Sequence, residues 1–402
     1  NLAAMENSGK GSAVAQRTNR ALAAAGPIFR FLMRPRDLEH PDACDFLAGN
    51  PQEIASSEYV KTIQQALIPD SRSYFAYGPP WQPAVNAAAK ALGERLGMSL
   101  DPADVFLTRG AASGLGTVFR MVLDPGDEVL MMSPPWFFYE AMVLAEGADA
   151  VKVQLTENFD LDLPAIEGAI TARTRIVIVN TPHNPSGRLL PEGQLRGLAQ
   201  ILERSSARVG RRIYLASDEA YARILFDGRQ MITPGRFYPA TFMLHSYSKT
   251  LLAPSQRAGY LAMPPGMPDK VQIRMALMAS SMAAGTVPDT GMQRAIPELE
   301  QQQIDMASIE RRRDRMVSEL RRIGYKLAVP EAGFYLFVEC PIPDATEFCD
   351  WLAERRVYTL PGEAFERPGY FRLSLTATDA MVDKALPVFG EAFATLAPSA
   401  AR

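Results

Sequence analysis

The chain has 402 residues, of which 47% are apolar and 22% are charged, and its 45 acidic and 42 basic side chains leave a net charge of −3. This composition is typical of a soluble globular protein, whereas binding to nucleic acid or an anionic membrane surface needs an excess of basic residues. No apolar run approaches the ~20 residues of a membrane-spanning helix. The three cysteines and three histidines lack metal-ligand spacing, so we expect a reduced, cytoplasmic protein without metal or disulfides.

The first hundred or so residues contain short predicted elements. Residues 20–25 are rich in alanine and predict a short helix that Gly26-Pro27 ends. Residues 45–51 predict a strand that turn residues interrupt. Residues 84–96 have alanine and leucine at helical spacing and predict an amphipathic helix.

From residue 104 onward, strand-like and helix-like segments alternate. The predicted strands are residues 105–107, 128–132, 151–153, 175–179, 213–216, 241–244 and 258–262, and the predicted helices between them are 115–123, 138–145, 163–170 and 191–203. Such alternation is typical of an α/β fold in which a mostly parallel sheet, here of seven strands, is covered by helices on both faces. Ligands of such sheets bind beyond the carboxyl ends of the strands.

The C-terminal part of the chain has a different pattern. Residues 292–323 predict one long linking helix whose charges form a solvated face, and residues 333–338 and 370–375 are the clearest strands of a smaller α+β unit. We therefore divide the chain into an N-terminal arm with part of the small domain, a large domain that carries the expected site, and a linking helix with the C-terminal small domain: residues 1–45, 46–290 and 291–402.

A lysine between hydroxyl groups is the most informative local feature. Lys249 ends the sequence Ser246-Tyr247-Ser248-Lys249, directly after a predicted strand, and Arg257 follows eight residues later. A lone lysine in a loop is usually a solvated charge. Hydroxyls and an arginine around one amine instead indicate a phosphate pocket beside a reactive nitrogen, because a Schiff-base lysine needs desolvation or neighbouring cations.

Three more polar side chains follow the ends of other predicted strands. Asn184 lies in His183-Asn184-Pro185-Ser186-Gly187, and Asp218 and Tyr221 lie in Ser217-Asp218-Glu219-Ala220-Tyr221. Taken alone, Asn184 is explained by a turn and Asp218 by the N-cap of a helix. Together with Lys249, they provide the contacts that a phosphorylated pyridine aldehyde, pyridoxal 5'-phosphate, requires.

Each of these groups has a chemical role toward that cofactor. Asp218 would keep the ring nitrogen protonated, and Asn184 and Tyr221 would bond to the ring hydroxyl. Lys249 would form the resting Schiff base and then act as general base at the substrate Cα. The phosphate would be held by a helix N-terminus and two side chains, namely Ala111, Ala112, Ser246 and Arg257.

As a set, these motifs resemble those of fold-type I pyridoxal-phosphate enzymes of the class I and II aminotransferase family. They occur in the family's order and approximate spacing, and the resemblance runs from about Phe46 to Leu375. It implies the aspartate-aminotransferase-like α/β fold. It also implies transamination, in which an L-amino acid gives its amino group to the cofactor and a 2-oxo acid takes it away.

The resemblance also implies further site residues. Trp136 matches an aromatic residue that stacks on the pyridine ring, and Arg372 matches the arginine that binds the substrate α-carboxylate through a two-pronged ion pair. Gly49 lies in a loop over the substrate, which Asn184 and Trp136 also face. Tyr74 matches a tyrosine that reaches the cofactor phosphate of the neighbouring subunit, which implies a homodimer with shared sites.

The sequence also departs from the pattern of these relatives. The turn Gly110-Ala111-Ala112-Ser113 has alanine where relatives place a hydroxyl or amide side chain. Phe137 makes the entrance more aromatic than an aspartate-specific site requires, as do its neighbours Phe138 and Tyr139. A second arginine for a dicarboxylate substrate is not determined, because five are possible: Arg30, Arg34, Arg36, Arg109 and Arg188.

Two other functions remain open. The same residues serve a biosynthetic pyridoxal-phosphate enzyme that performs elimination, replacement, cyclisation or oxidation, because imine exchange and Cα deprotonation are common to all of these reactions. A regulatory module of the same fold without catalysis needs an attached DNA-binding segment, and the first 45 residues are too weakly basic for one. We therefore expect an aminotransferase whose partners are amino acids, 2-oxo acids and a second copy of the chain.

Overall fold

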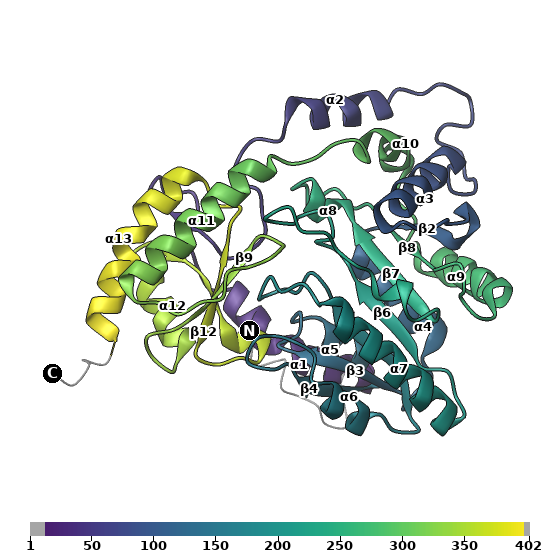
Figure 1. The fold of residues 1–402 in the computed structure, drawn as a ribbon. Coiled ribbons are helices and arrows are strands. Elements are labelled where there is room, and N and C mark those ends of the chain that lie inside the picture. The colour runs from purple at the N-terminus through teal and green to yellow at the C-terminus, as the bar shows by residue number, and fades with distance from the viewer. Residues whose placement is uncertain (1–12, 398–402) are drawn as a thin grey trace.

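The computed structural model describes residues 13–397, so the first 12 residues of the N-terminal arm lie outside the described part. A large sheet with its helices lies beside a smaller group built mainly from the C-terminal residues (Figure 1). Within residues 13–397, no helix is long and apolar enough to cross a membrane.

The strands are short and mostly buried. They are β1 (Cys44–Asp45), β2 (Val105–Thr108), β3 (Glu128–Ser133), β4 (Asp149–Gln154), β5 (Thr174–Asn180), β6 (Tyr214–Asp218), β7 (Thr241–Ser246), β8 (Gly259–Ala262), β9 (Tyr335–Glu339), β10 (Val357–Tyr358), β11 (Leu360–Pro361) and β12 (Tyr370–Ser374).

The helices surround these strands. They are α1 (Gln16–Leu32), α2 (Ser57–Ala66), α3 (Gln82–Leu96), α4 (Ala111–Val122), α5 (Tyr139–Ala145), α6 (Leu163–Ala169), α7 (Glu192–Val209), α8 (Tyr247–Thr250), α9 (Lys270–Ala284), α10 (Thr290–Leu299), α11 (Met306–Ile323), α12 (Ala345–Ala353) and α13 (Asp379–Leu396).

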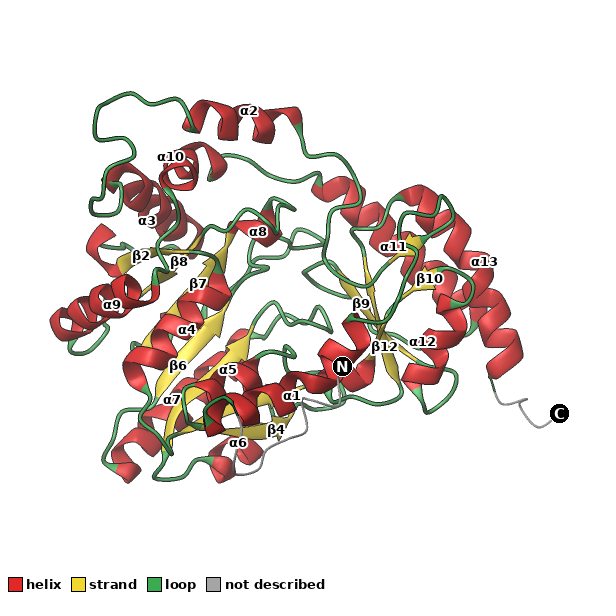
Figure 2. Ribbon diagram, turned by 180° about the vertical axis from the view of Figure 1, so that it is seen from behind, coloured by secondary structure: helices red, strands yellow, loops and turns green. Residues whose placement is uncertain are grey.

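The large sheet has seven strands in the order β2-β8-β7-β6-β5-β3-β4. All neighbouring pairs are parallel except those of β8, which runs antiparallel to both β2 and β7. Helices lie on both faces of this sheet, so strands such as β3 are buried along their whole length (Figure 2). This arrangement confirms the predicted α/β fold with a mostly parallel seven-stranded sheet.

The smaller group contains an antiparallel sheet in the order β11-β12-β9, together with α11, α12 and α13. A short parallel pair joins β1 near the N-terminus to β10, with Cys44 opposite Val357. The chain then continues past β1 as an irregular segment, so the strand predicted for residues 45–51 is wrong beyond its first residue. Asp45 Oδ1 accepts from the backbone of Leu47 at 2.9 Å, which turns the chain away from the sheet direction.

The single linking helix predicted for residues 292–323 is also wrong, because α10 ends at Leu299 and α11 begins at Met306. Glu300 is buried and pairs with Arg95 and Arg223, which turns the chain inward. Asp305 then caps the next helix by accepting from the backbone of Ser308 at 3.0 Å. Buried polar contacts therefore interrupt a sequence with good helical propensity.

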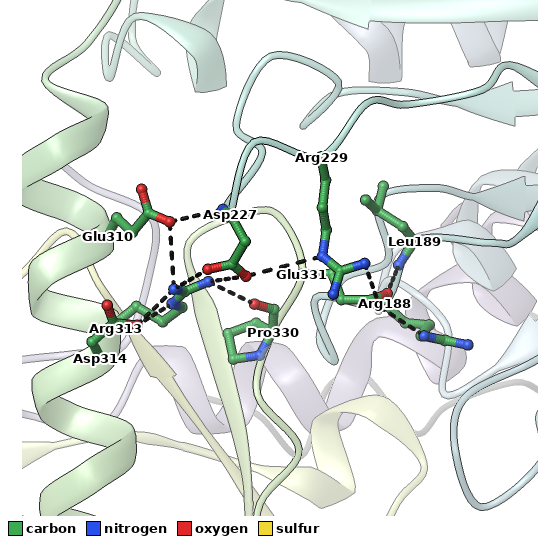
Figure 3. A network of polar contacts seen from close by, with 9 residues as sticks. All are labelled: Arg188, Leu189, Asp227, Arg229, Glu310, Arg313, Asp314, Pro330 and Glu331. Atoms are coloured by element: carbon green, nitrogen blue, oxygen red, sulfur yellow. Dashed lines mark hydrogen bonds and ion pairs between the residues drawn. The ribbon is translucent and has the colours of Figure 1, made fainter.

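The charges of α11 are not simply a solvated face. Arg312 and Arg313 are only 4% and 3% exposed. Figure 3 shows the guanidinium of Arg313 among Asp227, Glu310, Asp314 and the backbone carbonyl of Pro330. Arg312 bonds the carbonyl of Leu375 and pairs with Asp379 at the start of α13. These two arginines attach α11 to neighbouring segments, a role that the charge pattern did not indicate.

The N-terminal helix extends beyond its predicted end. Gly26-Pro27 lies inside α1, which continues to Leu32. The helix packs on α5, with Phe29 and Phe138 ring centroids 5.7 Å apart, and Arg20 pairs with Asp149 of β4. Tertiary packing therefore overrides the local helix-breaking signal.

Glu219 directly follows β6 and is fully enclosed on the side of the sheet opposite Asp218. Its carboxylate accepts hydrogen bonds from Ser217 at 2.8 Å and Thr233 at 2.5 Å. Burial raises the pKa of Glu219 from 4.5 to about 7, although both hydroxyl groups lower it. The protonated form is thus favoured by folding. The stabilisation that Glu219 contributes by holding this proton is fully present below about pH 4.5, and it is lost as the pH rises through about 7.

Replacing this acid with its neutral analogue should remove that pH dependence. Between about pH 6 and pH 8 the wild type should lose about 1 kcal/mol of stability through Glu219, and Glu219→Gln should not. Urea unfolding midpoints at the two pH values measure the difference, with the exposed Glu157→Gln as control. Equal pH dependence in wild type and Glu219→Gln would contradict the assignment.

Candidate active site

A cavity of about 210 Å³ lies where the parallel strands of the large sheet end and the smaller group begins. It brings together residues from segments far apart in the sequence. Eleven of the residues singled out from the sequence line it, namely Gly49, Ala111, Ala112, Trp136, Asn184, Asp218, Tyr221, Ser246, Lys249, Arg257 and Arg372.

One end of the cavity is a helix N-terminus. Gly110 has φ of 88° and precedes α4, whose first backbone N–H groups lack partners within the helix. A Cβ on Gly110 would lie 2.9 Å from Arg257 Nη2 and 3.2 Å from Ser246 Oγ. Glycine therefore lets the guanidinium and the hydroxyl approach the turn closely, and the donors together suit a dianion such as phosphate.

Arg257 is held at this end by neutral acceptors. It donates to Ser248 Oγ at 2.8 Å and to the carbonyls of Pro254 and Arg109 at 2.8 and 3.1 Å. No carboxylate within the described residues pairs with it. Burial lowers the pKa of Arg257, so an anionic ligand here would supply the missing countercharge.

Asp218 lies deep in the cavity at the end of β6. Its Oδ2 accepts from the Tyr139 hydroxyl at 2.5 Å, and its Oδ1 accepts from the backbone of Ala220 at 3.2 Å. Burial raises the pKa of Asp218, while these hydrogen bonds and the charge of Lys249 lower it. The hydrogen-bond donors of Asp218 are neutral, and a protonated ring nitrogen would add a cationic donor to this buried carboxyl group.

A chain of hydrogen bonds links Asp218 to the opposite wall. Asn180 Nδ2 donates to the carbonyl of Asp218 at 2.9 Å, and Asn180 Oδ1 accepts from the backbone of Asn184 at 2.7 Å. Asn184 Oδ1 in turn accepts from Arg372 at 2.9 Å. This last bond fixes the amide orientation, which leaves Asn184 Nδ2 as a donor to a ligand.

The loop that carries Asn184 is also held from outside. Glu331 accepts from Arg188 Nη1 and from the backbone of Leu189, each at 2.9 Å, and its own N–H donates to the carbonyl of Gly187 (Figure 3). The segment before β9 thereby binds the loop after β5. This joins Asn184 to the smaller sheet independently of Arg372.

Arg372 projects from β12 and is only 2% exposed. Besides Asn184, it donates to the carbonyl of Leu47 at 2.8 Å, and its guanidinium lies 3.8 Å from the Tyr335 ring centroid. Its Nε has no partner within the described residues. Burial lowers the pKa of Arg372, so this group, like Arg257, suits an anionic ligand group.

Tyr335 lines the cavity, and the sequence analysis did not select it. It accepts hydrogen bonds from the Tyr221 hydroxyl and the Gly49 backbone. Burial raises the pKa of Tyr335, but the positive charges of Arg372 and Lys249 outweigh burial and lower it. Tyr335 is the first residue of β9, and no motif in its neighbourhood marked it as a site residue.

Lys249 lies in the short helix α8, and its charge acts on both Asp218 and Tyr335. The Tyr247 hydroxyl donates to Glu300 at 2.6 Å, which fixes the start of α8 against that residue. Lys249 forms no ion pair within residues 13–397. Its amine therefore has no carboxylate partner that would compete with chemistry in the cavity.

The structure places Tyr74 away from this cavity. Its ring is buried beside Phe75 and the guanidinium of Arg294, and its hydroxyl has no partner within the described residues. The five arginines left open as possible side-chain ligands do not line the cavity either. Arg34 pairs with Asp350, and Arg188 pairs with Asp160 and Glu331.

Comparison with known proteins agrees with this geometry. The chain is 31% identical over 365 residues to the aspartate/prephenate aminotransferase of Thermus thermophilus, covering 87% of this chain and 90% of that protein. It is 29% identical over 357 residues to the aspartate aminotransferase of Thermotoga maritima, covering 86% and 90%.

Solved structures give the same result. An aminotransferase from Eubacterium rectale superposes with a TM-score of 0.84 at 28% identity, covering 96% of each chain. The Thermus thermophilus aspartate aminotransferase with maleate gives a TM-score of 0.80 at 28% identity, covering 95% of this chain and all of that one. The family model for aminotransferase class I and II matches residues 43–389. This chain therefore belongs to the class I and II aminotransferase family.

Proposed function

We propose that this aminotransferase binds pyridoxal 5'-phosphate, on which its family depends, in the cavity that contains Lys249. The observation that carries the proposal is that the buried Arg372 and the partly desolvated Arg257 line one cavity with Lys249 and Asp218, and neither arginine has an acidic partner among residues 13–397. A phosphate at one end and a substrate carboxylate at the other would compensate both charges.

The residues present fit the cofactor. Arg257, Ser246 and the first amides of α4 would hold its phosphate, and Asp218 would face its ring nitrogen. Asn184 would direct a hydrogen-bond donor at the ring hydroxyl, and Tyr221 would do the same by redirecting the proton that it donates to Tyr335 without a ligand. Burial raises the pKa of Tyr221 well above its ordinary value, so its hydroxyl keeps the proton that it donates.

When bound, pyridoxal phosphate supplies an aldehyde that condenses with amines and a ring that accepts the electron pair left at Cα. Lys249 holds the cofactor through its amine. When a substrate amine takes that place, the freed amine of Lys249 would act as the base that removes the proton from the substrate Cα. Arg372 and Asn184 orient the substrate carboxylate, while Trp136 covers the ring.

We further infer a homodimer with sites at the subunit interface. One face of α9 carries Val271, Met275, Met278 and Met282, which are between 48% and 77% exposed and follow helical spacing. A contiguous apolar stripe of this kind marks an interaction surface. The segment after α9 reaches Thr286, whose carbonyl accepts a hydrogen bond from the backbone of Arg109. Arg109 lies directly before the turn that begins α4, so the stripe runs toward the cavity. Phe75 and Tyr77 add exposed aromatic rings near Tyr74.

Placing a charge on the α9 stripe should weaken dimerisation. Met275→Glu with Met282→Glu should shift the wild-type dimer toward monomer by at least about tenfold in dissociation constant, because two charges would be buried without partners. Sedimentation velocity measures this. Exposed Lys90→Glu serves as the control, and an unchanged dissociation constant in the stripe variant would exclude α9 from the interface.

Removing the amine of Lys249 should abolish cofactor attachment and turnover together. Lys249→Ala should lose the visible absorbance of the lysine-bound cofactor and lower kcat by at least about a thousandfold, in line with loss of a covalent and general-base group. Absorbance spectra and steady-state transamination assays measure these effects. Lys90→Ala, at an exposed lysine, should behave as wild type; retained turnover in Lys249→Ala would contradict its role.

Substitutions of the two cavity arginines should separate cofactor binding from substrate binding. Arg257→Lys should weaken cofactor retention about 10- to 100-fold and Arg372→Lys should raise the amino-acid KM by a similar factor, because each change replaces a two-pronged charged contact. Equilibrium dialysis of the cofactor and steady-state kinetics at saturating cofactor measure the two constants. If each variant altered both constants equally, the assignment of the two ends of the cavity would be wrong.

A further inference from the structure

We propose that the preferred amino-acid substrate has a neutral apolar or aromatic side chain and not a second carboxylate. This inference rests on the proposed function of the cavity. It concerns the space beyond the α-carboxylate site at Arg372, and it differs from the aspartate specificity that the names of several relatives state.

Charge is the first argument. Among the described residues that line the cavity, the cationic side chains are Lys249, Arg257 and Arg372, and each is assigned to the cofactor or to the α-carboxylate. None of the five candidate arginines lines the cavity, and three of them have partners elsewhere. Arg34 and Arg188 form ion pairs, and Arg36 donates to backbone carbonyls. A side-chain carboxylate would therefore be desolvated without a counterion from the described residues of this chain, which is unfavourable.

A basic side chain on the substrate is disfavoured for a similar reason. Asp218 is the acid that lines the cavity within residues 13–397, and its carboxyl group already accepts from Tyr139 and Ala220. It lies on the cofactor side of the cavity. Neither sign of substrate side-chain charge would find a free partner, so a neutral side chain is favoured.

The wall beside Arg372 is aromatic. Phe365 lies 4.8 Å from the Arg372 guanidinium and 5.6 Å from Phe137 between ring centroids. Phe137 lies 4.8 Å from Phe138, which contacts Phe29 of α1 at 5.7 Å. Of these rings Phe137 lines the cavity, together with Trp136 and Tyr335, and the other rings support it through the packing toward α1. Such a surface binds an apolar or aromatic group through burial and edge-to-face contacts.

Small residues leave room for such a group. Ala48 and Ala112 line the cavity, together with the rings of Phe137 and Tyr335. Tyr335 already bonds to Tyr221 and Gly49.

Single-turnover reactions of the cofactor-loaded enzyme test this directly. The second-order rate constant for conversion of the cofactor spectrum should be at least about tenfold higher with L-phenylalanine or L-leucine than with L-aspartate or L-glutamate. A faster reaction with either dicarboxylate would overturn the substrate assignment and leave the proposed function intact, and would indicate that the partner subunit supplies a cation.

Binding of unreactive acids separates the two proposals. 3-Phenylpropanoate and butanedioate lack an amino group, so their dissociation constants, measured by calorimetry on the cofactor-loaded protein, do not depend on turnover. 3-Phenylpropanoate should bind at least about tenfold more tightly, and tighter binding of butanedioate would overturn the inference. If no amino acid changes the cofactor spectrum, the proposed function fails, and this comparison still decides the preference.

A variant of the aromatic wall provides the matched test. Phe137→Arg should reverse the preference by raising the rate with L-aspartate and lowering that with L-phenylalanine, each about tenfold, since it replaces a ring with a cation at the same place. Phe137→Leu is the comparison that removes the ring without adding charge, and it should lower the rate with L-phenylalanine without raising that with L-aspartate. No change of preference in Phe137→Arg would exclude this wall from substrate binding.

Discussion

The structure depends on one electrostatic constraint: two arginines, the buried Arg372 and the partly desolvated Arg257, line the same cavity without an acid among the described residues to neutralise them. Unpaired charges are costly to bury, and Arg257 and Arg372 reduce that cost through carbonyl, hydroxyl and amide acceptors alone. These acceptors fix the position of each guanidinium, but they are neutral and do not compensate its positive charge. The cavity is therefore built to favour a ligand that is anionic at both ends, with Lys249 and Asp218 between them.

The same contacts join the two parts of the fold. Arg372 comes from the smaller sheet, and its bond to Asn184 reaches the carboxyl end of the large sheet. Glu331 makes a second connection to the same loop through Arg188. A ligand that binds Arg372 and Asn184 would therefore interact with both sheets at once. The position of the smaller sheet and the binding of a substrate carboxylate are coupled through shared atoms.

Local sequence patterns predicted the large sheet well because strands that are buried on both faces must be apolar, and turn residues separate them. The patterns failed where tertiary contacts opposed local preference. Pro27 lies inside α1 because that helix packs on α5. The predicted linking helix is broken because Glu300 turns inward to Arg95. Arg313 is buried because acids from other segments surround it, and no local pattern reports such partners.

The sequence by itself determined the fold class and the identity of most residues that meet in the cavity. It could do so because parallel strands bring their carboxyl ends to one edge, so a polar residue after each strand is already placed. Only the tertiary structure revealed Tyr335 and Tyr139, whose hydroxyls act on Tyr221 and Asp218 across long sequence separations. It alone also decided that none of the five candidate arginines lines the cavity. The reach and pairing of a long charged side chain depend on which distant segments surround it, and neither is encoded in its immediate neighbours.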